Sequence, residues 1–149
     1  MSAKESSTQT VERVLSSVAV ILCLGACFWA RHHFSAMPAL TSAYLVEAVV
    51  LSIVCGACIW KSGHSGESFF VMLAWTTIGM LTGFTVMGLW SIGAPFVPVN
   101  LLLIVAAAIA GHRGNTSIFP NLTACALAMM AQAGLMVLVI RLVSGNHSS

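Results

Sequence analysis

Charge is the scarcest property of this sequence. Its 149 residues include 6 lysines and arginines and 4 glutamates but no aspartate, so 7% are charged, while 58% are hydrophobic. Soluble domains use about 25% charged residues. This scarcity excludes a water-soluble globule, a nucleic-acid-binding module, which needs a basic face, and a disordered chain, which needs charge and low hydrophobicity. The composition predicts a protein that crosses a membrane several times.

Histidine is missing from the long apolar segments. The five histidines fall in expected loops or tails, at His32, His33, His64, His112 and His147. A haem held within the membrane needs histidines on facing helices, and a di-metal site of the ferritin type needs more carboxylates than this chain has. No serine stands beside a histidine and an orienting acid in a nucleophile elbow. We therefore expect no metal, no cofactor and no catalytic residues, in a protein that is not an enzyme.

The few charges separate apolar segments of membrane-spanning length. A transmembrane helix needs about 20 apolar residues. The uncharged stretch 68–111 is too long for one helix and must turn back. Gly93, Pro95 and Pro98 indicate the turn, because glycine and proline end helices and proline suits the first turn of the next one. The sequence predicts an all-α bundle of five transmembrane helices, over about 14–30, 39–60, 68–90, 96–110 and 119–140.

A bundle of four helices is the alternative. The segment from Leu24 to Cys27 has the leucine, two small residues and cysteine of a lipoprotein cleavage site, and cleavage there would remove the first span and expose Cys27 for lipidation. Spans three and four could also form a single re-entrant hairpin. Small residues are ordinary at helix contacts, and Phe28 and Trp29 continue the apolar run, so five spans remain the prediction.

Basic residues favour one orientation of the bundle. We expect 1–13 to be a cytoplasmic tail, 14–141 a single transmembrane domain and 142–149 a C-terminal tail. With five spans, the N-terminal side carries Lys4, Arg13, Lys61 and Arg113, and the opposite side carries Arg31 and Arg141. Because cytoplasmic loops carry an excess of lysine and arginine, this distribution predicts a cytoplasmic N-terminus in the cell (inner) membrane.

One acid interrupts a predicted span. Glu47 lies near the middle of 39–60, where an acidic residue costs about 2.5–3.5 kcal/mol on insertion scales. Tyr44 lies one turn before it, Gln132 is near the middle of the fifth span and Asn100 is near the start of the fourth. Two interpretations remain open: these four side chains form a proton or ion site, or they form an interhelical clamp that fixes helix register.

Small residues and cysteines form two further patterns. Gly79 and Gly83 have the GxxxG spacing that lets two helix backbones pack closely, either within one chain or between chains. Cys55 and Cys58 have the C-x-x-C spacing of thiol oxidoreductases. No loop supplies a second cysteine pair to relay electrons, so we interpret both as small buried residues.

These observations lead to two functional hypotheses. The first is a non-catalytic subunit or assembly factor of a membrane complex, because the expected loops are too short to hold a soluble domain. Its partners would be the lipid bilayer and other transmembrane helices, in a hetero-complex or a homo-oligomer, and not nucleic acid. The second is a small proton-linked transporter or channel that acts as an oligomer and uses Glu47.

Overall fold

The structure is a computed structural model that describes residues 3–33, 39–65, 68–88 and 92–145. Within these ranges the chain forms helices and no strands. The elements are α1 (Ala3–His33), α2 (Ala39–Ser65), α3 (Ser68–Met87), the 3-10 helix η1 (Ala94–Phe96), α4 (Val97–Arg113) and α5 (Ile118–Gly145). Each of the five α-helices is long and apolar enough to cross a membrane. The all-α bundle of five helices is therefore confirmed.

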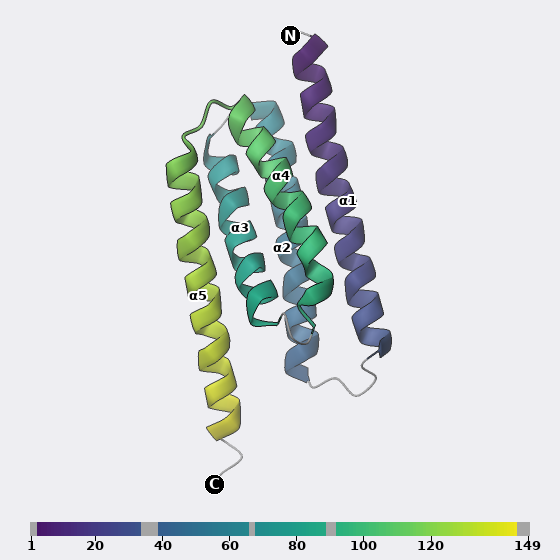
Figure 1. Cartoon of the computed structure of the whole chain (residues 1–149), viewed down its shortest axis with the longest axis vertical. Coiled ribbons are helices and arrows are strands. Elements are labelled where there is room, and N and C mark those ends of the chain that lie inside the picture. The colour runs from purple at the N-terminus through teal and green to yellow at the C-terminus, as the bar shows by residue number, and fades with distance from the viewer. Residues whose placement is uncertain (1–2, 34–38, 66–67, 89–91, 146–149) are drawn as a thin grey trace.

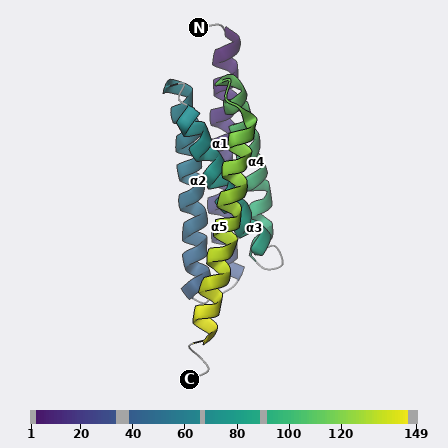
Figure 2. The same ribbon diagram turned by 90° about the vertical axis from the view of Figure 1, so that its left-hand side faces the viewer.

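The five helices lie side by side with alternating direction (Figure 1). Helix α3 packs against α2, α4 and α5, while α1 packs against α2 and α4. Helix α5 lies at the edge of the bundle and packs chiefly against α3 (Figures 1 and 2). This arrangement puts α3 at the centre and leaves most of the α5 surface uncovered.

Helix α1 is longer than predicted at its N-terminal end. The expected tail 1–13 is helical from Ala3 onward, so the helix begins well before Val14. One face of α1 carries small and polar residues at helical spacing, and the buried members are Glu12, Ser16, Ala19, Cys23 and Ala30. This buried face continues beyond the apolar segment toward the N-terminus. Because the predicted span began after the charged residue Arg13, the predicted helix was too short.

The predicted turn between the third and fourth spans lies where glycine and proline predicted it. Helix α3 ends at Met87, and the Gly93 amide donates to the Gly88 carbonyl at 2.6 Å. Helix η1 follows with Pro95 in its first turn, and α4 begins at Val97. Trp90, the predicted last residue of the third span, lies outside the described residues.

Aromatic rings close the bundle beside this turn. Phe84 of α3 and Phe96 of η1 are both buried, and their rings meet edge to face with centroids 5.3 Å apart. The Tyr44 ring of α2 lies against Phe84 with centroids 6.3 Å apart. These contacts fix α2, α3 and η1 relative to one another. Glu47 lies on α2 one turn from Tyr44, close to these aromatic contacts.

Candidate functional site

The structure brings two of the predicted site residues together across the bundle. The Gln132 Nε2 atom of α5 donates a hydrogen bond to Glu47 Oε1 of α2 at 2.8 Å, although 85 residues separate them in the chain. Gln132 is 1% exposed, and Glu47 is half-buried. We call these two residues the Glu47–Gln132 pair. It joins helices that otherwise hardly touch, since α2 and α5 lie on two sides of α3.

Glycine on α3 makes this hydrogen bond possible. A methyl group at Gly83 would lie 3.2 Å from Gln132 Cβ and 2.8 Å from the Met129 carbonyl oxygen. The bare backbone of α3 therefore lets the Gln132 side chain pass close to it and reach α2. Gly83 is a positioning residue for the Glu47–Gln132 pair.

The second glycine of the GxxxG pattern extends the same contact. A methyl group at Gly79 would overlap the backbone carbonyl of Cys125 in α5. Gly79 and Gly83 thus form one continuous close approach between α3 and α5, which is the largest helix contact of the bundle. The seam lies within one chain, so these two glycines are covered and do not offer a docking surface to another protein.

Tyr44 lies next to the pair without bonding to it. Its Oη atom is buried and has no hydrogen-bond partner among the described residues, and the same holds for Gln132 Oε1. Buried polar groups normally have a partner, and each one left without costs about 1–3 kcal/mol. Two unsatisfied polar atoms therefore lie at the level of Glu47, on α2 and on α5.

Asn100 belongs to a different contact. It is buried in α4, and its Nδ2 atom donates to Thr82 Oγ1 of α3 at 2.8 Å. Thr82 Oγ1 in turn donates to the Ile78 carbonyl oxygen at 2.8 Å within its own helix. The structure thus separates the four predicted residues into the Glu47–Gln132 pair with Tyr44 beside it, and an α3–α4 contact made by Asn100.

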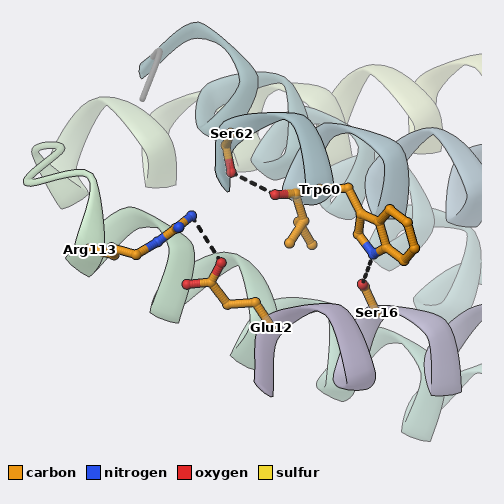
Figure 3. A network of polar contacts seen from close by, with 6 residues as sticks. Glu12, Ser16, Trp60, Ser62 and Arg113 are labelled. Atoms are coloured by element: carbon orange, nitrogen blue, oxygen red, sulfur yellow. Dashed lines mark hydrogen bonds and ion pairs between the residues drawn. The ribbon is translucent and has the colours of Figure 1, made fainter. Parts of the chain in front are cut away.

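A second buried acid, Glu12, was not predicted from the sequence. Glu12 is 1% exposed, and its Oε2 atom lies 3.0 Å from Arg113 Nη2, so an ion pair ties α1 to the end of α4 (Figure 3). Beside it, Trp60 Nε1 donates to Ser16 Oγ at 3.2 Å, which ties α1 to α2 (Figure 3). The spacing of Glu12 and Ser16 could have predicted the burial of Glu12, because Glu12 lies one turn before Ser16 and continues the buried face of α1.

The cysteines lie within the helix contacts. Cys55 is 1% exposed, and its Sγ atom lies 3.7 Å from the Ala74 carbonyl oxygen of α3. Cys58 is also buried. On α1, Cys27 Sγ lies 3.6 Å from the Leu45 carbonyl oxygen. No group of three potential metal-ligating histidine, cysteine or acidic side chains forms among the described residues.

Three surface hollows lie away from the Glu47–Gln132 pair. Two open where α4 meets α5, beside Asn115 and Thr116, with volumes of about 160 and 510 Å³. The third, of about 380 Å³, lies between α1 and α2 beside Trp60. None of these three hollows in the described part of the chain is lined by Glu47 or Gln132.

Comparison with known protein families, curated proteins and solved structures gives no significant match for this chain. Its function is therefore argued from the geometry alone.

Proposed function

We propose that this protein is a non-catalytic subunit or accessory factor of a membrane complex, and that it binds a partner transmembrane helix at the Glu47–Gln132 pair. The observation that carries the proposal is the unfinished hydrogen bonding there. Glu47 is partly exposed and accepts one hydrogen bond, from Gln132, while the buried atoms Tyr44 Oη and Gln132 Oε1 have no partner among the described residues.

The partner is defined by chemistry. The partly exposed Glu47 carboxyl has two oxygens that accept hydrogen bonds, and Gln132 donates to one of them. In hydrocarbon an unsatisfied polar group costs several kcal/mol, with no water to replace the missing bond. A helix that places a serine, threonine, asparagine or lysine donor against the partly exposed Glu47 carboxyl would give it a second hydrogen bond. Interhelical hydrogen bonds of this kind contribute about 0.6–2 kcal/mol each in membranes.

The surface of α5 supports the same proposal. Within its membrane-spanning window, 11% of the residues are buried inside the bundle, against 56% for α3. Its outward side chains include Leu127, Met130, Leu135 and Leu138, each at least half exposed. A partner helix would lie along these apolar side chains and reach the pair from the side.

Purification from native membranes in mild detergent tests this proposal. We expect a stoichiometric membrane protein to accompany the wild-type chain and to be lost from Glu47→Leu and Gln132→Leu. Glu47→Gln should leave expression and assembly nearly unchanged, because glutamine keeps most of the hydrogen bonding. Asn100→Leu is the matched control, since Asn100 is buried but bonds to Thr82 away from the pair. A wild-type chain that purifies without any partner contradicts the proposal.

A second candidate is a small proton-linked transporter or channel that acts as an oligomer. One observation favours it: among the described residues, Glu47 forms no ion pair and its carboxyl is hydrogen-bonded to the neutral amide of Gln132. Reconstituted vesicles discriminate the two. Proton-coupled uptake that Glu47→Gln abolishes would support transport, whereas no uptake by the wild type for any substrate tried removes this candidate.

A further inference from the structure

Two thiols lie together where α1 packs against α2. Cys23 is 0% exposed, and Cys27, one helical turn further along α1, is half-buried. Side chains four positions apart lie on one face of a helix, and here the two cysteine side chains interact with each other directly. We call these two residues the Cys23–Cys27 pair. It offers two sulfur ligands at a single place in the bundle.

Helix α2 holds both sulfur atoms in position. Cys27 Sγ lies 3.6 Å from the Leu45 carbonyl oxygen, and Cys23 Sγ lies 3.7 Å from the Ala48 carbonyl oxygen. Each thiol therefore has its own backbone acceptor on α2. Because both side chains are already ordered by this helix contact, a ligand that binds them loses less free energy to ordering.

A serine hydroxyl lies next to the buried thiol. Ser52 Oγ is 3.2 Å from Cys23 Sγ and 2.8 Å from the Ala48 carbonyl oxygen. A hydroxyl has one proton to donate, and a hydrogen bond to an ionised group is about twice as strong as one to a neutral group. Once Cys23 loses its proton, donation to the sulfur is the stronger choice. Ser52 is thus placed to stabilise a thiolate at Cys23.

This ligand set is soft and has two members. Thiolates favour Cu(I) and zinc over hard cations such as magnesium and calcium. Structural zinc takes four protein ligands, and within the described ranges no three histidine, cysteine or acidic side chains gather in one place. Cu(I) is satisfied by two thiolates on opposite sides of the metal. The Cys23–Cys27 pair therefore matches Cu(I) in both softness and ligand number.

The other close cysteines of the chain lack access. Cys55 and Cys58 on α2 are both buried, at 1% and 6% exposure, and Cys55 Sγ faces the Ala74 carbonyl oxygen of α3. Cys27, in contrast, keeps part of its surface exposed. A metal ion can therefore reach the Cys23–Cys27 pair through Cys27 without separating α2 from α3.

We propose that the Cys23–Cys27 pair binds one Cu(I) ion. Both thiols lose their protons to water and form sulfur–copper bonds, so the bound complex carries one negative charge beside the Ser52 hydroxyl. The expectation of no metal rested on the few histidines and carboxylates of the spans, whereas this site uses thiols. The proposal does not depend on the function proposed for the Glu47–Gln132 pair, which faces α5.

Titration of the full chain with Cu(I) tests the proposal. The reduced protein in mild detergent competes with a chromophoric Cu(I) chelator under anaerobic conditions. We expect one tightly held Cu(I) per chain, a thiolate-to-copper charge-transfer absorption in the near ultraviolet, and two protons released per copper in weakly buffered solution. An excess of Zn(II) should not displace the copper, because two ligands do not complete a zinc site.

Substitutions locate the bound ion. Cys23→Ser and Cys27→Ser should each weaken Cu(I) binding by more than about 100-fold, because losing an outer-shell partner alone costs about 10–100-fold. Ser52→Ala should weaken it by about 10-fold as such an outer-shell partner. The double variant Cys55→Ser/Cys58→Ser is the matched control, with the same change at two buried cysteines of α2, and it should bind as the wild type does.

A fold check accompanies these measurements. Cu(I) should raise the thermal unfolding midpoint of the wild type and of Cys55→Ser/Cys58→Ser, because a ligand that binds only the folded state stabilises it. It should not raise the midpoint of Cys23→Ser or Cys27→Ser. If a single cysteine variant does not fold, Ser52→Ala still tests the site through its weaker binding.

Several results would overturn the proposal. One is copper binding with unchanged affinity in Cys23→Ser and Cys27→Ser, and another is copper binding by the wild type without proton release, since thioethers and neutral imidazoles release none. A third is a wild-type chain that loses all its copper to the chelator. A fourth is a disulfide between Cys23 and Cys27 in native membranes, found by mass spectrometry after thiol blocking, because it would leave no thiolate for the metal.

Discussion

At the scale of single residues, the described membrane-spanning segments hold two acids, Glu12 in Ser7–His33 and Glu47 in Ser42–Ser62, and each is held in a different way. Glu12 forms an ion pair with Arg113 at the end of α4, whereas Glu47 accepts one hydrogen bond from the neutral amide of Gln132 in α5. The first arrangement places an opposite charge against one oxygen of the carboxyl. The second leaves an acceptor at the surface of the bundle, and that difference separates a structural acid from a candidate binding residue.

Replacing Glu12 by glutamine should destabilise the fold. The substitution removes the ion pair and leaves the guanidinium of Arg113, 21% exposed, without its counter-charge. We expect a loss of about 1–3 kcal/mol in unfolding free energy, in the range for a buried hydrogen-bond partner that is removed. Thermal unfolding in detergent measures it, with Arg141→Gln on the exposed end of α5 as the control. Equal melting of Glu12→Gln and the wild type would contradict a structural role for the ion pair.

Cys55 and Cys58 should be unreactive in the folded protein. Both are buried, Cys55 at 1% exposure against α3, and a thiol needs access to water to ionise and react. We expect maleimide to modify neither until the chain is denatured, and mass spectrometry of the labelled peptides checks it. A cysteine placed at exposed His32 gives the positive control. Rapid labelling, or a redox phenotype of Cys55→Ser/Cys58→Ser, would reopen the thiol-enzyme hypothesis.

At the scale of helices, α5 depends on one neighbour. It packs chiefly against α3, and the contact requires bare backbone at Gly79 and Gly83. The same contact carries Gln132 to Glu47. The geometry of the candidate site is therefore a consequence of how closely these two helices approach.

A methyl group at Gly79 should separate the two helices. Gly79→Ala would overlap the Cys125 carbonyl, and forcing extra volume into a packed contact costs about 1–3 kcal/mol. Gly134→Ala on α5 is the control, because no atom lies within 4 Å of the added methyl group. Thermal unfolding should show a lower midpoint for Gly79→Ala alone. Identical midpoints for the two variants would mean that α5 does not pack on α3 as described.

The helices were largely predictable from the sequence, and their contacts were not. The thickness of a bilayer sets the length of a transmembrane helix. The number of residues in each apolar run therefore predicted the five helices and the turn at Gly93 and Pro95. Glu47 and Gln132 were predicted to belong to one polar site, because a polar side chain deep in the membrane must find a hydrogen-bond partner. Which residues meet depends on which helices are neighbours. That is why Asn100 is found with Thr82, and why Glu12 was taken for part of a tail.

At the scale of the whole molecule, the bundle has two chemically different ends. One end gathers Glu12, Arg13, Lys61 and Arg113, and the other carries Arg31 and the histidines that follow it on α1. The excess of basic residues at the first end is the basis on which the sequence predicts a cytoplasmic N-terminus, and this orientation stays a prediction.

Cysteine labelling of intact cells measures this orientation. In a chain whose five native cysteines are replaced, a membrane-impermeant maleimide should label His32→Cys from outside and should label Ser7→Cys only after the membrane is permeabilised. Both positions are exposed on α1, at opposite ends of the same helix. Labelling in the reverse pattern would place the N-terminus outside.

The most direct test of the account is site-directed photo-crosslinking in native membranes. A benzophenone side chain is placed at Val50, one turn from Glu47, or at Leu135, one turn from Gln132, and Leu24 on α1 is the control. The account predicts a crosslink to one partner protein from Val50 and Leu135 that is absent from Leu24 and is lost with Gln132→Leu. Crosslinks to lipid alone at all three positions would contradict it.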